Sequence, residues 1–342
     1  MTSVIFSLVM FGGFDNVNAS EISFNIFQEC GRDKDCVHKQ MMELSENASE
    51  DVVLFVANNL TYLWEKEQYP CHQVAHHMGM FLIGYYNGDF VTALSEVENV
   101  CGNSLYHGIM ENYLPTKLLL DDITVEELDI VTPCITFDKS QTSNTFRQCV
   151  HGVGHGLAVV YEFDVIEAVK RCDGFENPRA RYECADGLFM QNHNQYFENT
   201  GKGAYREDDL LYPCNFVTDV EFQEACYQYQ GNIILSRNNF SYTDTFKICE
   251  ELPAEDSRQG CTRTVSQYMT DWYFSNNFEK IVEMCNDVNT NHPNSCIESA
   301  VYSLIIYADK DPMIVLCPLF RGEQRQYCEQ MNYWVLNDND RI

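Results

Sequence analysis

The chain has 342 residues, of which 45% are hydrophobic, 21% charged and 13% aromatic. This composition can form one large core or several small ones, and it excludes disordered and collagen-like proteins. Acidic residues outnumber basic ones by 51 to 22, and the net charge of −29 would repel a phosphate backbone or an anionic membrane surface. We therefore expect no nucleic-acid partner.

The N-terminus carries an apolar run, Val4 to Phe14, followed by the small-residue sequence Val17-Asn18-Ala19. This pattern predicts that residues 1–19 form a signal peptide, although no Lys or Arg precedes the run. An uncleaved anchor is disfavoured because about eleven apolar residues fall short of the roughly twenty that span a bilayer. We expect a secreted or extracytoplasmic mature chain without a transmembrane segment.

Sixteen cysteines are distributed along the chain, and none forms a Cys-x-x-Cys motif. Their spacing argues against zinc ribbons, thioredoxin-type redox sites and c-type haem attachment. An even number of widely spaced cysteines is typical of a disulfide framework in an oxidising compartment. Asn47, Asn59 and Asn239 begin glycosylation sequons, which agrees with export.

The cysteines recur in couples, which reveal an internal repeat. The couples are 134/149, 172/184, 214/226, 249/261, 285/296 and 317/328. The second members follow one another at intervals of 35, 42, 35, 35 and 32 residues, so the repeat is about 35 residues long. The other four cysteines fit if Cys30 pairs with Cys36 and Cys71 with Cys101.

Each couple predicts a helical hairpin. A short amphipathic run such as 164–172 precedes the first cysteine, a polar loop follows, and a longer apolar run such as 296–307 starts at the second cysteine. Hairpins of this kind bury their apolar faces by stacking. We predict an all-α fold, an α-solenoid of disulfide-stapled hairpins, with His-rich repeats over residues 20–200 and further repeats, continuous with them, over 201–342. The period is that of tetratricopeptide-like repeats, but their sequence signature is absent.

Histidines are concentrated in the first half, where seven of the nine lie between residues 72 and 193. Three of them, His77, His107 and His155, each stand six residues after a cysteine. Other ligand-type side chains lie one helical turn apart: His72 and His76, His151 and His155, and His107 and Glu111. Glycines next to them cost up to about 1 kcal/mol each in a helix, which requires an offsetting benefit.

Imidazoles on helix faces with a carboxylate in reach are typical ligands of Zn²⁺, Cu²⁺ or Fe²⁺. We predict a transition-metal site formed from His77, His107 and His155, with His72, His76 and His151 as further candidates and His193 as a weaker one. If the site is catalytic, Glu111 is the candidate proton acceptor in a metal-assisted hydrolysis. Zincin, nucleophile-elbow and phosphate-loop motifs are absent, so enzymatic activity stays open.

Two alternatives compete with the metal site. The histidines could be core groups hydrogen-bonded to backbone, in a metal-free structural solenoid or one that binds a protein or peptide on its concave face. Cys149 beside His151 superficially resembles a cysteine-protease pair, but we expect Cys149 to be in a disulfide.

Overall fold

The computed structural model describes residues 34–47, 50, 53–54, 57, 71–97, 104–141, 143–197, 203–273, 277–287, 293–306 and 311–337. Regular structure in these ranges consists of fifteen α-helices and three 3₁₀-helices, without strands, which confirms the all-α prediction. The predicted signal peptide lies outside the described residues. The described residues form two compact units, one made of those up to 163 with 167–188, and the other made of 164–166 with those from 189 onward.

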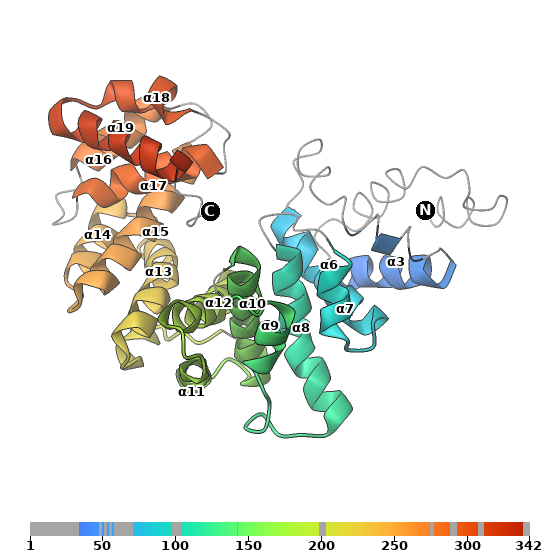
Figure 1. Ribbon diagram of the computed structural model, residues 1–342. Helices are drawn as coiled ribbons and strands as arrows, with labels where there is room; N and C mark the ends of the chain where they lie inside the picture. The colour runs from blue at the N-terminus through green and yellow to red at the C-terminus, as the bar shows by residue number, and fades with distance from the viewer. Residues whose placement is uncertain are drawn as a thin grey trace, which may run out of the picture. The chain divides into compact units, whose positions relative to one another are not determined.

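The first unit is built on three long helices that pack side by side in chain order. Helix α6 (Cys71–Tyr85) packs against α8 (Ser104–Asp121), and α8 packs against α10 (Asn144–Val160) (Figure 1). Helix α3 (Lys34–Asn47) packs against α6. The short helices α7 (Phe90–Ser95) and α9 (Thr132–Phe137) lie between the long ones in the chain. Helix α11 (Val165–Ala168), the 3₁₀-helix η2 (Val169–Gly174) and α12 (Pro178–Phe197) follow, and the division between the two units runs through α11 and α12.

The second unit repeats this alternation of long and short helices. Helix α13 (Val220–Arg237) packs against α15 (Glu255–Tyr273), α15 against α17 (Pro293–Ile306), and α17 against α19 (Gly322–Asn337). The shorter elements are η3 (Cys214–Phe216), α14 (Tyr242–Glu250), α16 (Phe278–Asp287), α18 (Pro312–Val315) and η4 (Cys317–Leu319). Buried apolar side chains from several of these helices form its core, among them Ile281, Ile297, Val301, Leu304 and Phe320.

Six disulfides join the cysteines that the repeat pairs. They are Cys134–Cys149, Cys172–Cys184, Cys214–Cys226, Cys249–Cys261, Cys285–Cys296 and Cys317–Cys328. Each closes a loop of 11 to 15 residues, which in the chain-entropy model stabilises the fold by about 3 kcal/mol. Cys36 is also disulfide-bonded, while the predicted partners Cys30 and Cys101 lie outside the described residues.

The long helices start earlier than the cysteine pattern predicts. The second cysteine of each couple lies three to six residues inside its helix instead of at the first position. Local N-terminal signals explain the shift. Ser143 caps α10 by accepting a hydrogen bond from Phe146 N at 3.0 Å, and Asp219 caps α13 in the same way. Pro178 and Pro293 are the first residues of α12 and α17, a position that suits the fixed φ of proline.

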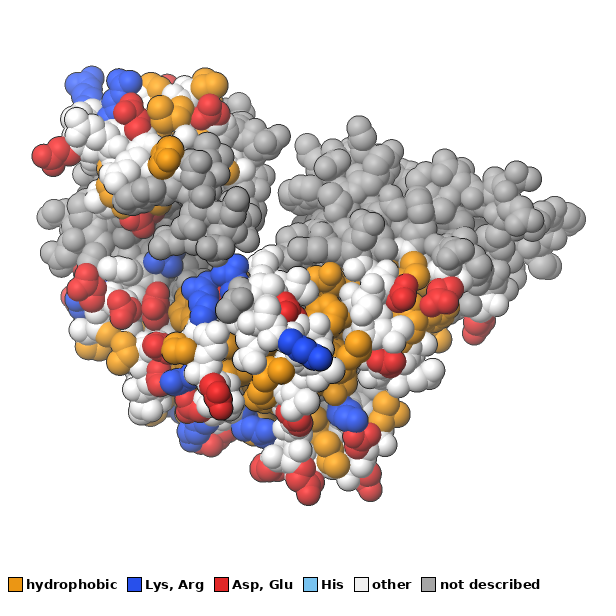
Figure 2. Space-filling model, in the orientation of Figure 1, with side chains coloured by type: hydrophobic (Ala, Val, Ile, Leu, Met, Phe, Trp, Pro, Cys, Tyr) orange, Lys and Arg blue, Asp and Glu red, His pale blue; other side chains and the backbone are white. Residues whose placement is uncertain are grey.

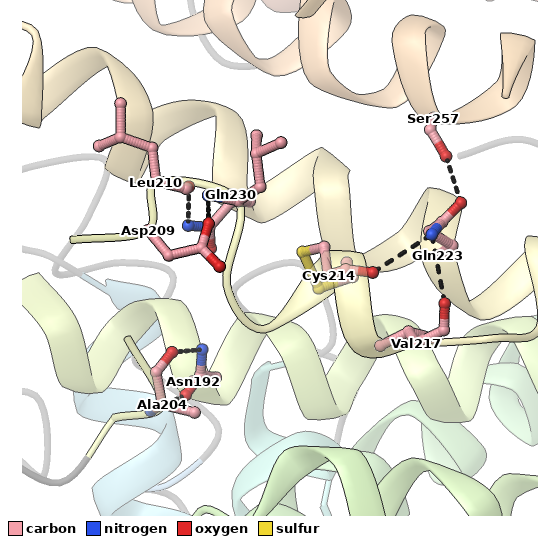
Figure 3. The surroundings of a disulfide bond; sticks show 11 residues. Asn192, Ala204, Asp209, Leu210, Cys214, Val217, Gln223, Gln230 and Ser257 are labelled. Atoms are coloured by element: carbon pink, nitrogen blue, oxygen red, sulfur yellow. Dashed lines mark hydrogen bonds between the residues drawn. A yellow bond between two sulfur atoms is a disulfide. The ribbon is translucent and has the colours of Figure 1, made fainter. Parts of the chain in front are cut away.

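Side-chain amides fix the irregular segment before α13 in the second unit (Figure 3). Gln223 Nε2 donates to the carbonyl oxygens of Cys214 and Val217 at 3.3 and 3.2 Å, and Ser257 Oγ donates to Gln223 Oε1 at 3.3 Å. Gln230 and Asn192 bind the backbone of Leu210 and Ala204. Backbone groups outside the α-helices are thereby satisfied.

Acidic side chains occur at several places on the face of the described residues drawn in Figure 2, with basic and hydrophobic side chains between them. Among the helices that the structure describes, each is too short or too polar to cross a lipid bilayer.

Candidate metal centre

Helices α6, α8 and α10 bring four histidine rings together in the first unit. His76 comes from α6, His107 from α8, and His151 and His155 from α10. The ring centroids of His76 and His155 are 5.0 Å apart, those of His107 and His151 4.5 Å, and those of His151 and His155 4.9 Å. Since α6 and α10 lie on either side of α8, all three helices contribute to one cluster.

Three of these rings form a compact set of donor atoms. One nitrogen each from His76, His107 and His155 lies within 4.8 Å of the other two. His155 is fully buried, His107 is 4% exposed, and the His76 side chain is 11% exposed. This buried group, which we call the three-histidine group, could hold a metal ion.

Side-chain oxygens hold the outer nitrogens of two of these rings. His76 Nδ1 lies 2.8 Å from Glu111 Oε2, and because an ionised carboxylate only accepts hydrogen bonds, this contact favours the tautomer with the proton on Nδ1. His107 Nε2 hydrogen-bonds Gln148 Oε1, while the amide nitrogen of Gln148 donates to Asn144. The inner nitrogens, His76 Nε2 and His107 Nδ1, are therefore the ones with a lone pair, and both are buried. A metal ion binds imidazole through such a nitrogen.

His151 belongs to a second group of potential ligands together with two carboxylates from α12. The ligand atoms of His151, Glu183 and Asp186 lie within 4.8 Å of one another, and all three residues are buried. His151 Nδ1 is 3.2 Å from Asp186 Oδ2. We call these residues the carboxylate group.

Electrostatics mark the carboxylate group as costly for the fold. Burial raises the pKa of Glu183 above its ordinary value, and the neighbouring Asp186 carboxylate adds to this effect. Arg179 opposes the shift through an ion pair with Glu183 at 2.7 Å, but the Arg179 side chain is 58% exposed. Solvent therefore screens the compensation that Arg179 supplies, while His151 and Arg147 also lower the pKa of Glu183.

Glycines let the helix backbones approach closely at the level of the histidines. A Cβ atom on Gly108 would lie 2.5 Å from the backbone of His76, and one on Gly187 would lie 1.9 Å from the carbonyl oxygen of His151. These distances are shorter than real Cβ contacts allow, so both positions require glycine. Close packing is thus the benefit that offsets the helix stability that these glycines cost.

The predicted site residues fall into three sets. His76, His107, His151 and His155 lie together, and Glu111 contacts His76. The side chains of His72 and His77, on α6, lie outside the described part of the chain. His193 lies elsewhere, with Nδ1 3.4 Å from Asn194 Oδ1 and Nε2 3.5 Å from Asn232 Nδ2, and burial lowers its pKa to about 4.

Three residues of the cluster are absent from the sequence-based prediction: Gln148, Glu183 and Asp186. One sequence signal does point to Asp186, which stands two residues after Cys184 as His151 stands two after Cys149. A glycine follows each of them directly, Gly152 and Gly187. Extending the comparison of repeats from histidine to all ligand types would have selected Asp186.

Cys149 is bonded to Cys134, which confirms that it is no thiol nucleophile for His151. Comparison of the chain with protein-family models, with curated proteins and with solved structures finds no significant match.

Proposed function

We propose that this protein binds a transition-metal ion through His76, His107 and His155. The observation that carries the proposal is the approach of three buried imidazole nitrogens, from three different helices, to within 4.8 Å of one another. Neutral imidazole nitrogens are common metal ligands, and one ion could be shared by all three rings.

The spacing suits an ion after a small adjustment. With metal–nitrogen bonds of about 2.0–2.1 Å and tetrahedral angles, ligand nitrogens stand about 3.4 Å apart. Movements of the ligand nitrogens by roughly 1 Å would bring them from within 4.8 Å of one another to this separation. Glu111 and Gln148 hold His76 and His107 in the tautomers that binding requires, as partners of metal-bound histidines commonly do.

Imidazole donors suit Zn²⁺, Cu²⁺ or Fe²⁺. Three protein ligands leave a coordination position open, and an ion held in this way supplies Lewis-acid chemistry for hydrolysis. Glu111 is then the candidate proton acceptor, a role that competes with its contact to His76. His72 and His77 remain candidates for further ligands from α6.

We also propose the setting that the sequence predicts, an exported α-solenoid. Six disulfides favour an oxidising compartment. The side-by-side order of long helices within each unit is what stacked hairpins produce. Asn239, an exposed turn residue, is accessible to glycosylation. In this setting the protein is a metal-binding factor or a metal-dependent hydrolase.

Metal analysis of untagged protein tests the site. Protein stripped with a chelator and reloaded with Zn²⁺ should hold stoichiometric ion by mass spectrometry of the element, and His107→Gln/His155→Gln should lose one equivalent. His193→Gln, which removes a histidine outside the cluster, is the matched control and should bind as the wild type does. Circular dichroism without metal verifies that each variant folds. Uptake unchanged in the double variant, or no uptake by folded wild type, contradicts the proposal and favours the metal-free alternative.

A further inference from the structure

The carboxylate group borders the three-histidine group, and the two meet at His151. The His151 ring lies 4.5 Å from that of His107 and 4.9 Å from that of His155, while its Nδ1 faces Asp186. His151 is thus in contact with ligands on both sides.

We propose that His151, Glu183 and Asp186 bind a second divalent cation beside the ion of the three-histidine group. This site uses none of the three proposed ligands of the first ion. One imidazole and two carboxylates form a mixed nitrogen and oxygen donor set that suits Zn²⁺, Fe²⁺ or Mn²⁺.

The burial of the two carboxylates supports this site. Glu183 and Asp186 are three residues apart on α12, so they share a helix face, and they are only 8% and 9% exposed. Two buried carboxylates at close range repel each other, and a shared proton or nearby positive charge relieves the repulsion. Arg179 forms an ion pair with Glu183, and Arg147 also acts on Glu183. Because a carboxylate offers about four lone-pair positions, these contacts leave capacity for a metal ion.

His151 supplies the nitrogen ligand of this site. Its side chain is buried, at 5% exposed, and its Nδ1 lies on the ring edge that faces Asp186. The imidazole and the two carboxylates are therefore buried together, on two different helices.

The distance between His151 and Asp186 fits metal ligation. The 3.2 Å between Nδ1 and Oδ2 is close to the separation of about 3.3 Å that two ligands of one tetrahedral ion adopt. When the ion binds, it takes the Nδ1 lone pair and the ring proton is carried by Nε2, so His151 stays neutral. An orienting Asp–His pair alone would not explain the position of Glu183 within 4.8 Å of the same atoms.

The test counts ions in matched variants of the full chain. Stripped wild-type protein titrated with Zn²⁺ should bind two equivalents, Glu183→Gln/Asp186→Asn should bind one, and His107→Gln/His155→Gln should bind one. Asp173→Asn, which removes a more exposed carboxylate paired with Arg181, is the matched control and should bind two.

The outcomes separate the two sites. One equivalent in wild type, unchanged in Glu183→Gln/Asp186→Asn, overturns the second site and leaves the three-histidine site standing. Wild type could instead bind one equivalent, with Glu183→Gln/Asp186→Asn losing it and His107→Gln/His155→Gln keeping it. That result overturns the first site. Should these variants unfold, electron paramagnetic resonance of wild type with Cu²⁺ decides. Magnetic coupling that appears when the second equivalent of Cu²⁺ is added supports two neighbouring ions. Two uncoupled signals, or binding of a single equivalent, overturn the second site.

Discussion

Glu111 is the residue through which the three-histidine group can be adjusted without removing a ligand. Its carboxylate fixes the proton of His76 on Nδ1, and so presents Nε2 to the interior. Partners of this kind raise the basicity of the histidine and restrict its rotation. The contact is partly accessible, since the Glu111 side chain is 17% exposed, so a substitution there disturbs packing less than one at His155.

We predict that Glu111→Gln weakens Zn²⁺ binding by roughly 10-fold, because partners of metal-bound histidines typically contribute 10- to 100-fold in affinity. The amide still accepts a hydrogen bond but loses the negative charge. Competition with a chromophoric chelator measures the change. Glu127→Gln, an exposed carboxylate that binds Thr124, is the control. Equal affinities for wild type and Glu111→Gln would remove Glu111 from the site.

His193 gives the protein a pH dependence of a definite sign. Burial against Phe197 and Tyr229 lowers its pKa to about 4 in the folded state, from 6.5 in the unfolded chain. The unfolded chain therefore binds the proton first, so the contribution of His193 to stability is complete above pH 6.5 and is lost as the pH falls toward 4.

For wild type, this linkage predicts a loss of about 2 kcal/mol in the free energy of unfolding between pH 7 and pH 5. His193→Gln should lack that part of the pH dependence, because glutamine does not titrate. Urea unfolding of stripped protein at both pH values measures how the free energy of unfolding depends on pH in wild type and in His193→Gln. An equal dependence in the two proteins would show that His193 is not buried as a neutral ring.

Close approach between helices, more than helix propensity, determines the geometry of the site at the scale of elements. Gly79 and Gly108 face each other where α6 crosses α8, and a Cβ on Gly79 would lie 2.3 Å from Gly108 C. The backbone of α6 therefore touches that of α8 beside His76, which allows His76 and His155 rings to meet across α8.

We predict that Gly108→Ala destabilises the fold by about 1–3 kcal/mol, the usual cost of overpacking, and lowers metal affinity because α6 must move away from α8. Gly84→Ala in α6 is the control, since a Cβ there meets nothing within 4 Å, and helix propensity should raise stability by up to about 1 kcal/mol. Thermal unfolding and Zn²⁺ titration of both variants test this. A Gly108→Ala protein as stable as Gly84→Ala would refute the close approach.

The sequence predicts the helical class and all six described disulfides, because a cysteine spacing of 11 to 15 residues recurs regardless of tertiary context. It predicts less well which histidines meet. Alignment on the cysteines makes equivalent positions adjacent and so selects His77, whose side chain lies outside the described residues. It does not select His76, which packing sets against Gly108. How far one helix is shifted along its neighbour depends on how their side chains pack, and a repeat alignment carries no information on this packing. Glu183 lies one residue before Cys184, so an alignment that runs forward from each cysteine does not include it.

At the scale of the whole molecule, every proposed ligand of both ions belongs to the first compact unit, and the second unit has a core of its own. Ligands that bind only the folded state stabilise it by mass action, by about 2.7 kcal/mol when the free ion is at 100 times its dissociation constant. Binding of the proposed ions would therefore be linked to the folding of the first unit. In stacked repeats, nearest-neighbour interfaces can pass part of such stabilisation along the chain.

We predict that Zn²⁺ slows hydrogen exchange of the most protected amides in α6, α8 and α10 by up to about 100-fold for each bound ion at that concentration, while α15, α17 and α19 change little. The reason is that exchange of amides in α6, α8 and α10 requires opening of the helices that would hold the ions. Exchange of wild type with and without Zn²⁺, followed by mass spectrometry of peptides, measures both sets, and His107→Gln/His155→Gln serves as the control that should respond less. Equal slowing in both sets of helices would mean that the two units unfold together, as a strongly coupled solenoid does, and would contradict local linkage. Slowing confined to α15, α17 and α19 would place metal binding outside the histidine cluster altogether.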